Sequence, residues 1–504
     1  MEEKEKNPQQ GDSQSSSSKA AEKRVVTTLD SLPAGSQEDF GSKTSIKHPL
    51  PEGVTSKMLY RDILKIGWPA LVELMLMQLT SMADLMMVGR LGPWAITAVG
   101  LTSQPKFLLS TAFIALNVGT MAMVGRYRGA NNREKAKLVL RQAFMLNMAL
   151  GLLFAVIGVI FSETLVSFMG ATEEKVLIAG TQYLQVQMIG MFSVSMTTAI
   201  TNALRGSGDS KTAMIYNTTA NAVNFVFNYL LIYGKFGFPR LEVLGASIAT
   251  VLGQVVSLIM AICHVRKKTQ YVRLEFPKGS IKPDFECIGN IAKIGVPSMV
   301  EQLAMRVGVI IFSKTIANLG TVAYATHQVC MNIQALTFMN GQAFATSSTS
   351  LVSQSLGKGR PDMAMHYSKR TQRTGMFISI LIALFIFFCN KFVLSLYSDD
   401  ISIITTGASL LQMMAFIQPF QASQFILAGA LRGAGDTKYT AMVTTLTVML
   451  LRPCLALLLV NQFDLGLQGA WYALVADQVL RTCLIVLRYM SGKWTSSFRH
   501  NAHA

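Results

Sequence analysis

Long apolar stretches separated by short polar ones fill the chain from Ile63 onward. Each stretch is about 20 residues or longer, which is enough for an α-helix to cross a hydrocarbon layer of ~30 Å. The apolar residues run continuously, so the pattern favours membrane-spanning helices over the alternating strands of a β-barrel. An all-α polytopic membrane protein with twelve transmembrane helices is therefore predicted. The spans are expected near residues 63–88, 95–125, 138–161, 177–203, 213–234, 245–265, 291–316, 322–356, 374–397, 403–430, 441–461 and 469–489.

Positive charge divides unevenly between the two sets of loops that twelve spans create. One set carries 20 Lys and Arg residues and the opposite set carries 4. The rich set comprises loops 126–137, 204–212, 266–290, 357–373 and 431–440. The positive-inside rule places this set and both termini in the cytoplasm. The net charge of +17 thus reflects how the chain is oriented in the membrane. Nucleic-acid binding is not expected, because no basic patch is interleaved with aromatic residues.

Residues 1–57 differ in composition from the rest of the chain. They hold nine acidic residues, eight Lys or Arg residues and a run of four serines at 15–18. Such a segment buries too little apolar surface to offset the entropy of ordering, so a disordered cytoplasmic tail is predicted. It also lacks the apolar core of a secretory signal.

An internal duplication divides the remaining chain into two halves. Residues 63–74 read ILKIGWPALVEL and residues 291–302 read IAKIGVPSMVEQ, with seven of twelve positions identical. Residues 203–214 (ALRGSGDSKTAM) and 430–441 (ALRGAGDTKYTA) match to the same extent. One six-helix unit has therefore been duplicated in the same membrane orientation.

The duplication predicts two lobes related by a pseudo-two-fold axis along the membrane normal. The N-lobe is expected over 58–285 and the C-lobe over 286–490, followed by a cytoplasmic tail at 491–504. Two such lobes around a central cleft can alternate access by rocking, which favours a carrier over a channel.

Several motifs in collinear order make the chain resemble the multidrug and toxic compound extrusion (MATE) family of secondary transporters. These are the IGxP opening of both halves, DLMMVGRLG at 84–92, LRGxGD at 204–209 and 431–436, NYLLIYGKFG at 228–237 and ATHQ at 325–328. The resemblance implies two six-helix bundles around a V-shaped cleft. It also implies export of organic, often cationic, compounds in exchange for H⁺ or Na⁺ by alternating access. We expect a monomer in the plasma membrane, whose partners are small-molecule substrates and lipid.

The sequence contains none of the common catalytic constellations, so an enzyme is not expected. We find no Walker A, GxSxG or HExxH motif, and the six Cys and six His residues show no metal-ligand spacing. No cofactor or metal is predicted beyond the coupling ion. Two alternatives remain open: a flippase for lipid-linked saccharides from the same superfamily, and a membrane assembly protein that transports nothing.

Carboxylates inside predicted spans are costly in lipid and are functional candidates by default. Glu73 and Asp84 lie eleven residues apart in the first helix, which places them within about 20° of one face and ~16 Å apart along the axis. Met77 lies between them on this stripe. A water-accessible lobe interior suits such a face better than lipid does. Asp84 also matches the family's first-helix acid, which implies a role in cation or proton coupling, and Glu73 is a weaker candidate for the same role.

Three further polar residues are candidates for the coupling site. Asn224 and Asn228 share one face of the fifth helix, and Thr250 in the sixth could add a hydroxyl. The family often has Asp at the position of Asn228, so its replacement by an amide argues against a Na⁺ site, because hard cations prefer carboxylate oxygens. Hydrogen bonding between helices is the structural alternative for all three residues.

Members of the resembled family commonly use an acid in the seventh helix, at a varying offset from the helix proline, so Glu301 in that helix is a candidate for a second proton or substrate-cation group. The alternative is a buried ion pair with Arg306 or Lys314. Amides and a methionine are candidates for the substrate cleft, with interhelical bonding as their alternative. They are Gln185, Gln412, Gln418 and Met77.

Overall fold

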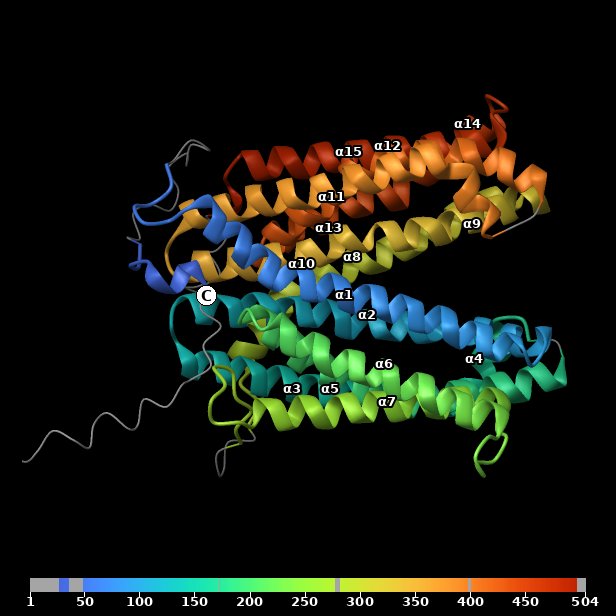
Figure 1. Cartoon of the computed structure of the whole chain (residues 1–504), viewed down its shortest axis with the longest axis horizontal. Helices are drawn as coiled ribbons and strands as arrows, with labels where there is room; N and C mark the ends of the chain where they lie inside the picture. Colours follow the sequence, from blue (N-terminus) through green and yellow to red (C-terminus); the bar gives the residue numbers. More distant parts are fainter. Residues whose placement is uncertain (1–26, 36–48, 172, 277–281, 398–399, 496–504) are drawn as a thin grey trace, which may run out of the picture.

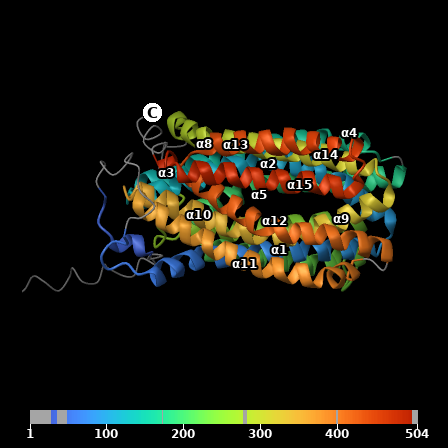
Figure 2. The same ribbon diagram turned by 90° about the horizontal axis from the view of Figure 1, so that it is seen from above.

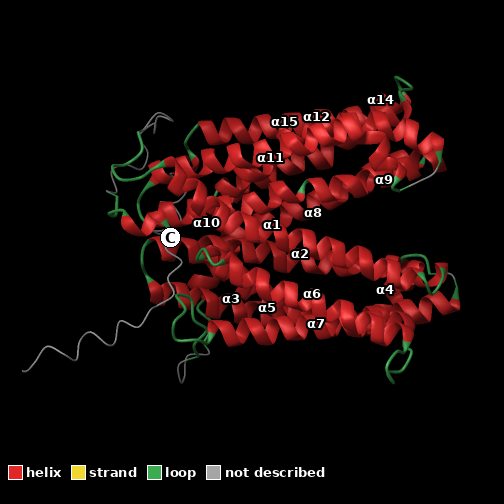
Figure 3. Ribbon diagram, viewed as in Figure 1, coloured by secondary structure: helices red, strands yellow, loops and turns green. Residues whose placement is uncertain are grey.

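Helices make up the architecture throughout the residues that the computed structural model describes, which are 27–35, 49–171, 173–276, 282–397 and 400–495. Those residues form helices and connecting loops, without strands (Figure 3). The first half comprises η1 (Thr28–Ser31), α1 (Ser56–Gly89), α2 (Pro93–Gly129), α3 (Arg133–Ile160), α4 (Ser162–Phe168), α5 (Glu174–Gly206), α6 (Ser210–Tyr233) and α7 (Glu242–Val265). The second half comprises α8 (Phe285–Ala317), α9 (Thr321–Thr337), α10 (Met339–Gly357), α11 (Pro361–Ser395), α12 (Ile401–Gly433), α13 (Thr437–Thr444), the π-helical turn η3 (Thr445–Leu451), α14 (Arg452–Asn461) and α15 (Gly466–Met490).

The predicted spans correspond to these helices, with two interruptions that the hydropathy pattern does not reveal. The stretch predicted at 322–356 consists of α9 followed by α10, with a break at Phe338. The stretch predicted at 441–461 consists of α13, the π-helical turn and α14. The π-helical turn lies within an apolar run, so the backbone and not the hydropathy reports it.

Nine helices of the described chain are long and apolar enough to cross a membrane by themselves, counting the run from α13 to α14 as one. The spans outside that set are α5, α6 and the pair α9 and α10. They are the more polar spans, because α5 and α6 line a polar cavity and α10 lines the contact between the lobes.

The helices form two groups, α1–α7 and α8–α15, which run along a common long axis (Figures 1 and 2). The groups lie against each other at the end that carries η1 and the end of α15, and they diverge toward the other end (Figure 1). We call the first of these the basic end. It carries the connections 130–132, 207–209, 358–360 and 434–436.

Small residues and side-chain hydrogen bonds join the two lobes near the basic end. A Cβ on Gly129 of α2 would lie 1.9 Å from the carbonyl oxygen of Gln354, and one on Gly357 would lie 2.0 Å from that of Arg126. Only glycine allows the two backbones to approach so closely. The hydroxyl of Ser350 donates to the carbonyl of Arg205 at 2.6 Å, across the same seam. The lobes are therefore sealed together at the basic end.

The prediction of a disordered tail over 1–57 does not hold for residues 27–35. There η1 packs against the bundle, and Leu29 is only 3% exposed. Leu29 and Leu32 join an apolar cluster that includes Leu59 and Ile63 of α1 and Phe344 of α10. Two leucines thus supply a local apolar anchor that the average composition of the tail conceals. The rest of the predicted tail up to residue 48 lies outside the described residues.

Candidate functional site

A polar cavity of roughly 440 Å³ lies inside the N-lobe. Its walls come from α1, α5, α6 and α7, with a single side chain from α2. The polar stripe predicted on the first helix faces this cavity from Glu73 through Met77 to Asp84. The remaining polar lining residues are Thr80, Ser81, Lys106, Thr197, Thr198, Thr201, Asn202, Arg205, Asn217, Asn221, Asn224, Thr250, Gln254 and Ser257.

The carboxylate of Asp84 accepts hydrogen bonds from side-chain amides of α6, the fifth predicted span. The side chain of Asn228, fully buried, donates to Asp84 Oδ1 at 2.5 Å. The amide orientation of Asn224 that satisfies both its neighbours donates to the same oxygen at 3.0 Å and accepts from the Thr250 hydroxyl at 3.0 Å. The structure therefore brings together Asp84, Asn224, Asn228 and Thr250, the four residues that the sequence suggested for one coupling site.

Glu73, at the other end of the stripe, is engaged by a cation. Arg205 Nη2 and the amide of Asn217 each lie 2.7 Å from Glu73 Oε1. The ion pair joins the middle of α1 to the last turn of α5, which ends in the LRGxGD motif. Glu73 Oε2 is buried without a hydrogen-bond partner in the described part of the chain.

Glu301 has the equivalent arrangement in the C-lobe. Only 1% exposed, it pairs with Arg432 and accepts from the hydroxyl of Thr440 at 3.1 Å. The two Glu–Arg pairs occupy matching positions of the internal repeat. The sequence-based alternative of a pair with Arg306 or Lys314 is wrong, because Arg306 lies over the ring of Phe107 at 3.4 Å and Glu301 is held by Arg432.

The charges of the LRGxGD motifs therefore do not pair within each motif. The arginines reach the carboxylates of α1 and α8, while the aspartates bind elsewhere. Asp209 caps α6 by accepting from the backbone of Thr212 at 3.1 Å, and Asp436 pairs with Arg488 at 2.8 Å.

The candidate cleft residues have different environments. Met77 is half-exposed and lines the N-lobe cavity. Gln418 is buried and donates to the Thr337 hydroxyl of α9, which is the interhelical bonding that the sequence left open. Gln185 is half-buried and Gln412 is exposed. The N-lobe cavity brings together Met77 with four of the coupling candidates, Glu73, Asp84, Asn224 and Thr250. Glu301 lies in the C-lobe, and the three glutamines do not line this cavity.

Lys106, Arg205 and Asn217 are site residues that the sequence reasoning missed. Lys106 is a cation in the middle of a predicted span, so the criterion applied to intramembrane acids would have found it. Its ammonium group donates to Gln187 Oε1 at 2.6 Å. Arg205 and Asn217 reach Glu73 from 132 and 144 residues away, and no sequence spacing reports such contacts.

Comparison with known proteins decides the family. The MatE family model matches residues 69–230 and again residues 297–458, so both halves of the repeat match. The chain belongs to the multidrug and toxic compound extrusion (MATE) family. As a MATE protein it is a multi-pass membrane transporter of small molecules with twelve helices in two lobes, and it is not an enzyme.

Relatives and solved structures agree with this assignment over nearly their whole length. The chain is 27% identical to "Probable multidrug resistance protein NorM" of Thermotoga maritima, covering 86% of this chain and 93% of that protein. It is 24% identical to "Multidrug resistance protein MdtK" of Yersinia pestis, covering 85% and 94%. A structure described as the "Outward-facing conformation of a multidrug resistance MATE family transporter of the MOP superfamily" has a similar fold, with a TM-score of 0.81 at 22% identity over 88% of this chain and 97% of that one.

Proposed function

We propose that this MATE transporter is a secondary active exporter of organic compounds, many of them cationic, in exchange for H⁺. Membership of the family and the names of its relatives support multidrug export. The observation that supports proton coupling is the setting of Asp84, a carboxylate in a cavity whose direct donors are the neutral amides of Asn224 and Asn228. Coupling to Na⁺ is less well supported, because a hard cation prefers the second carboxylate that Asn228 replaces.

The hydrogen bonds of Asp84 suggest how a proton would change the N-lobe. The ionised carboxylate accepts from both asparagines, whereas the protonated acid carries a donor of its own. Protonation therefore forces the Asn224, Asn228 and Thr250 contacts between α1, α6 and α7 to rearrange. In the proposed cycle this rearrangement shifts the balance between the two lobe orientations and releases substrate outward.

Glu73 and Glu301 are proposed to take part in coupling through their arginines. Each carboxylate ties the first helix of its lobe to an LRGxGD turn at the basic end. A proton or a substrate cation at either carboxylate would weaken that tie. Substrate is proposed to contact Met77 and the amides of Gln185, Gln412 and Gln418 along the cleft.

The orientation follows from the same reasoning. The basic end is proposed to face the cytoplasm, with both termini on that side and the protein in the plasma membrane as a monomer. The seal at the basic end then corresponds to a state open to the outside.

Flux measurements on the full-length protein in proteoliposomes test the proposal. Ethidium transport is driven by an imposed pH gradient or by a Na⁺ gradient, in wild type, Asp84→Asn and the control Glu163→Gln, an exposed carboxylate on α4. We expect pH-driven flux in wild type and in the control, and its loss in Asp84→Asn. Flux driven only by Na⁺, or full pH-driven flux in Asp84→Asn, would refute proton coupling at this residue.

A further inference from the structure

The charges that line the N-lobe cavity balance to zero. The two carboxylates, Glu73 and Asp84, are matched by the two cations, Lys106 and Arg205. Glu73 and Arg205 pair directly with each other at 2.7 Å. The remaining charges are therefore Asp84 of α1 and Lys106 of α2, which line the same cavity and attract each other electrostatically. For a cavity proposed to admit organic cations, this neutrality is an unexpected property.

Lys106 and Asp84 form no direct ion pair in the described chain. The ammonium group donates instead to the amide oxygen of Gln187, a buried residue of α5 that itself donates to the carbonyl of Ser247. Lys106 is thus anchored to α5, while both it and Asp84 line the same cavity. An anchored cation of this kind opposes any mobile cation that approaches the carboxylate.

We propose that Lys106 acts as a permanently bound cation of the cavity, here called the resident cation. It competes with exported cations and with Na⁺ for the negative charge of Asp84. Lys106 would thereby set the ion specificity of the N-lobe site. A proton is favoured over Na⁺ because it binds Asp84 covalently as O–H and needs no shell of oxygen ligands. An organic cation must in turn contact Asp84 while the lysine stays anchored at Gln187. This inference rests on the proposed function of the N-lobe cavity.

Binding measurements on full-length protein in nanodiscs test the role of Lys106. The probes are ²²Na⁺ and ethidium, and the variants are Lys106→Met, which keeps the length of the side chain, and Lys106→Arg, which keeps its charge. Removal of the like charge should tighten binding of both cations by about tenfold or more, or ~1.4 kcal/mol. Lys106→Arg should bind like wild type, and Lys106→Met/Asp84→Asn should lose the gain. Lys175→Met serves as the control, because Lys175 lies over the Trp94 ring outside the cavity.

The outcomes separate this inference from the proposed function. Unchanged or weaker cation binding in Lys106→Met, with the variant folded by gel filtration, would overturn the role of Lys106 even if wild type exports ethidium. If wild type exports no ethidium while Lys106→Met gains cation affinity, the proposed export function fails and the resident cation stands.

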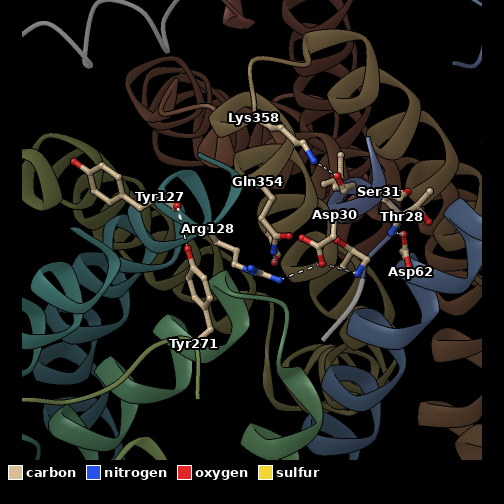
Figure 4. Close-up of polar contacts among 12 residues, drawn as sticks. Thr28, Asp30, Ser31, Asp62, Tyr127, Arg128, Tyr271, Gln354 and Lys358 are labelled. Atoms are coloured by element: carbon tan, nitrogen blue, oxygen red, sulfur yellow. Dashed lines mark hydrogen bonds and ion pairs between the residues drawn. The ribbon is translucent and has the colours of Figure 1, made fainter. Parts of the chain in front are cut away.

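A second, independent observation concerns residues 27–35, here called the N-terminal strap. The strap lies at the basic end and precedes the part of the chain that the family model matches, which begins at residue 69. Figure 4 shows it between side chains of both lobes. On the N-lobe side, Arg128 at the end of α2 pairs with Asp30 at 3.1 Å, and the guanidinium also lies over the ring of Tyr271 at 4.3 Å.

On the other side the strap is tied to the C-lobe. The ammonium of Lys358 donates to the carbonyl of Leu29, and the backbone N–H of Gly35 donates to the carbonyl of Lys358 at 3.2 Å. Asp62 of α1 extends the connection, because its carboxylate accepts from the backbone of Thr28 at 2.7 Å and from the hydroxyl of Tyr367 at 2.8 Å. The strap thus contacts both lobes through a short stretch of chain. It binds Arg128 of the N-lobe and Lys358 of the C-lobe.

We infer that the N-terminal strap is a latch that stabilises the state closed at the basic end. Alternating access requires the lobes to separate there. That movement draws Arg128 away from Lys358, so the Asp30 ion pair or the Lys358 contacts must break first. Loss of the pair should therefore favour the state open at the basic end.

Spin-label distance measurements on the full-length protein test the latch. Labels are placed at Lys211→Cys and Lys438→Cys, exposed equivalents at the starts of α6 and α13, after replacement of the six native cysteines. Asp30→Asn should raise the ratio of long to short distances about two- to five-fold, as expected for a partly buried ion pair. The charge reversal Asp30→Arg/Arg128→Asp should restore the wild-type ratio. Asp362→Asn, whose pair with Arg360 stays within the C-lobe, is the control. An unchanged ratio in Asp30→Asn would overturn the latch.

Discussion

Removal of Arg432 should destabilise the C-lobe strongly, because it leaves a buried carboxylate without its cation. Glu301 is 1% exposed and accepts hydrogen bonds from Arg432 and Thr440. Without Arg432, the Thr440 hydroxyl would be the remaining one of these two donors. The loss of one partner of a buried ion pair costs about 3–5 kcal/mol. We therefore expect Arg432→Met to lower the free energy of unfolding by about that amount.

The reverse substitution should cost less. In Glu301→Gln the amide oxygen still accepts from Arg432, whose side chain is 14% exposed and can be hydrated in part. A loss of about 1–2 kcal/mol is expected, as for a weakened hydrogen bond. The loss of unfolding free energy in the double variant Glu301→Gln/Arg432→Met should be smaller than the sum of the two single losses by at least ~1 kcal/mol, since the two groups interact directly.

Equilibrium unfolding in mixed micelles with increasing SDS measures these differences. Arg240→Met is the control, because its pair with Glu242 is exposed and should contribute about 0–1 kcal/mol. A loss in Arg432→Met no larger than that of the control, or strict additivity in the double variant, would refute the reasoning.

Two further predictions concern the basic end. Gly129→Val should destabilise the closed seam by about 1–3 kcal/mol, because its Cβ would meet the Gln354 carbonyl; the spin-label pair described above measures the opening, and Gly100→Ala, which has open space, is the control. Burial opposes ionisation of Asp209, but the His264 ring 3.6 Å from its carboxylate and the hydrogen bonds from Thr212 outweigh it and hold the pKa of this carboxyl below its ordinary value. Its contribution to stability is complete above the pKa of an unfolded Asp, about 3.9, and is lost as the pH falls through the lower folded pKa. Asp209→Asn should therefore lower the Tm at pH 7 by more than at pH 3.5, and an equal shift at both pH values would contradict this.

The features that were predictable from the sequence are those that local patterns encode. Continuous apolar stretches report the spans, and helical spacing places Glu73, Met77 and Asp84 on one face, which the structure shows lining one cavity. The two internal matches report the repeat, because duplicated helices retain the residues that shape their turns.

The features that escaped prediction depend on long-range contacts or on averages. Arg205 and Arg432 each reach a carboxylate more than a hundred residues away, which no local spacing reports. The strap was hidden by the polar composition of its surroundings, although Leu29 and Leu32 suffice to anchor it. The π-helical turn changes the backbone within a continuous apolar run, which hydropathy alone does not report.

Comparison of the two repeats separates charges that both lobes share from a charge that only the N-lobe carries. The Glu–Arg pairs occur in both lobes, at Glu73–Arg205 and Glu301–Arg432, as expected for a tie that any such six-helix unit needs. Asp84 has no such counterpart, because the equivalent position is Phe312, a buried ring beneath the guanidinium of Arg452. Arg452 in turn is neutralised by Asp477, which also pairs with Arg481, so this part of the C-lobe is occupied by its own charges. The protonation step proposed above is therefore placed at Asp84, which has no counterpart in the C-lobe, whereas the coupling role proposed for the Glu–Arg pairs is common to both lobes.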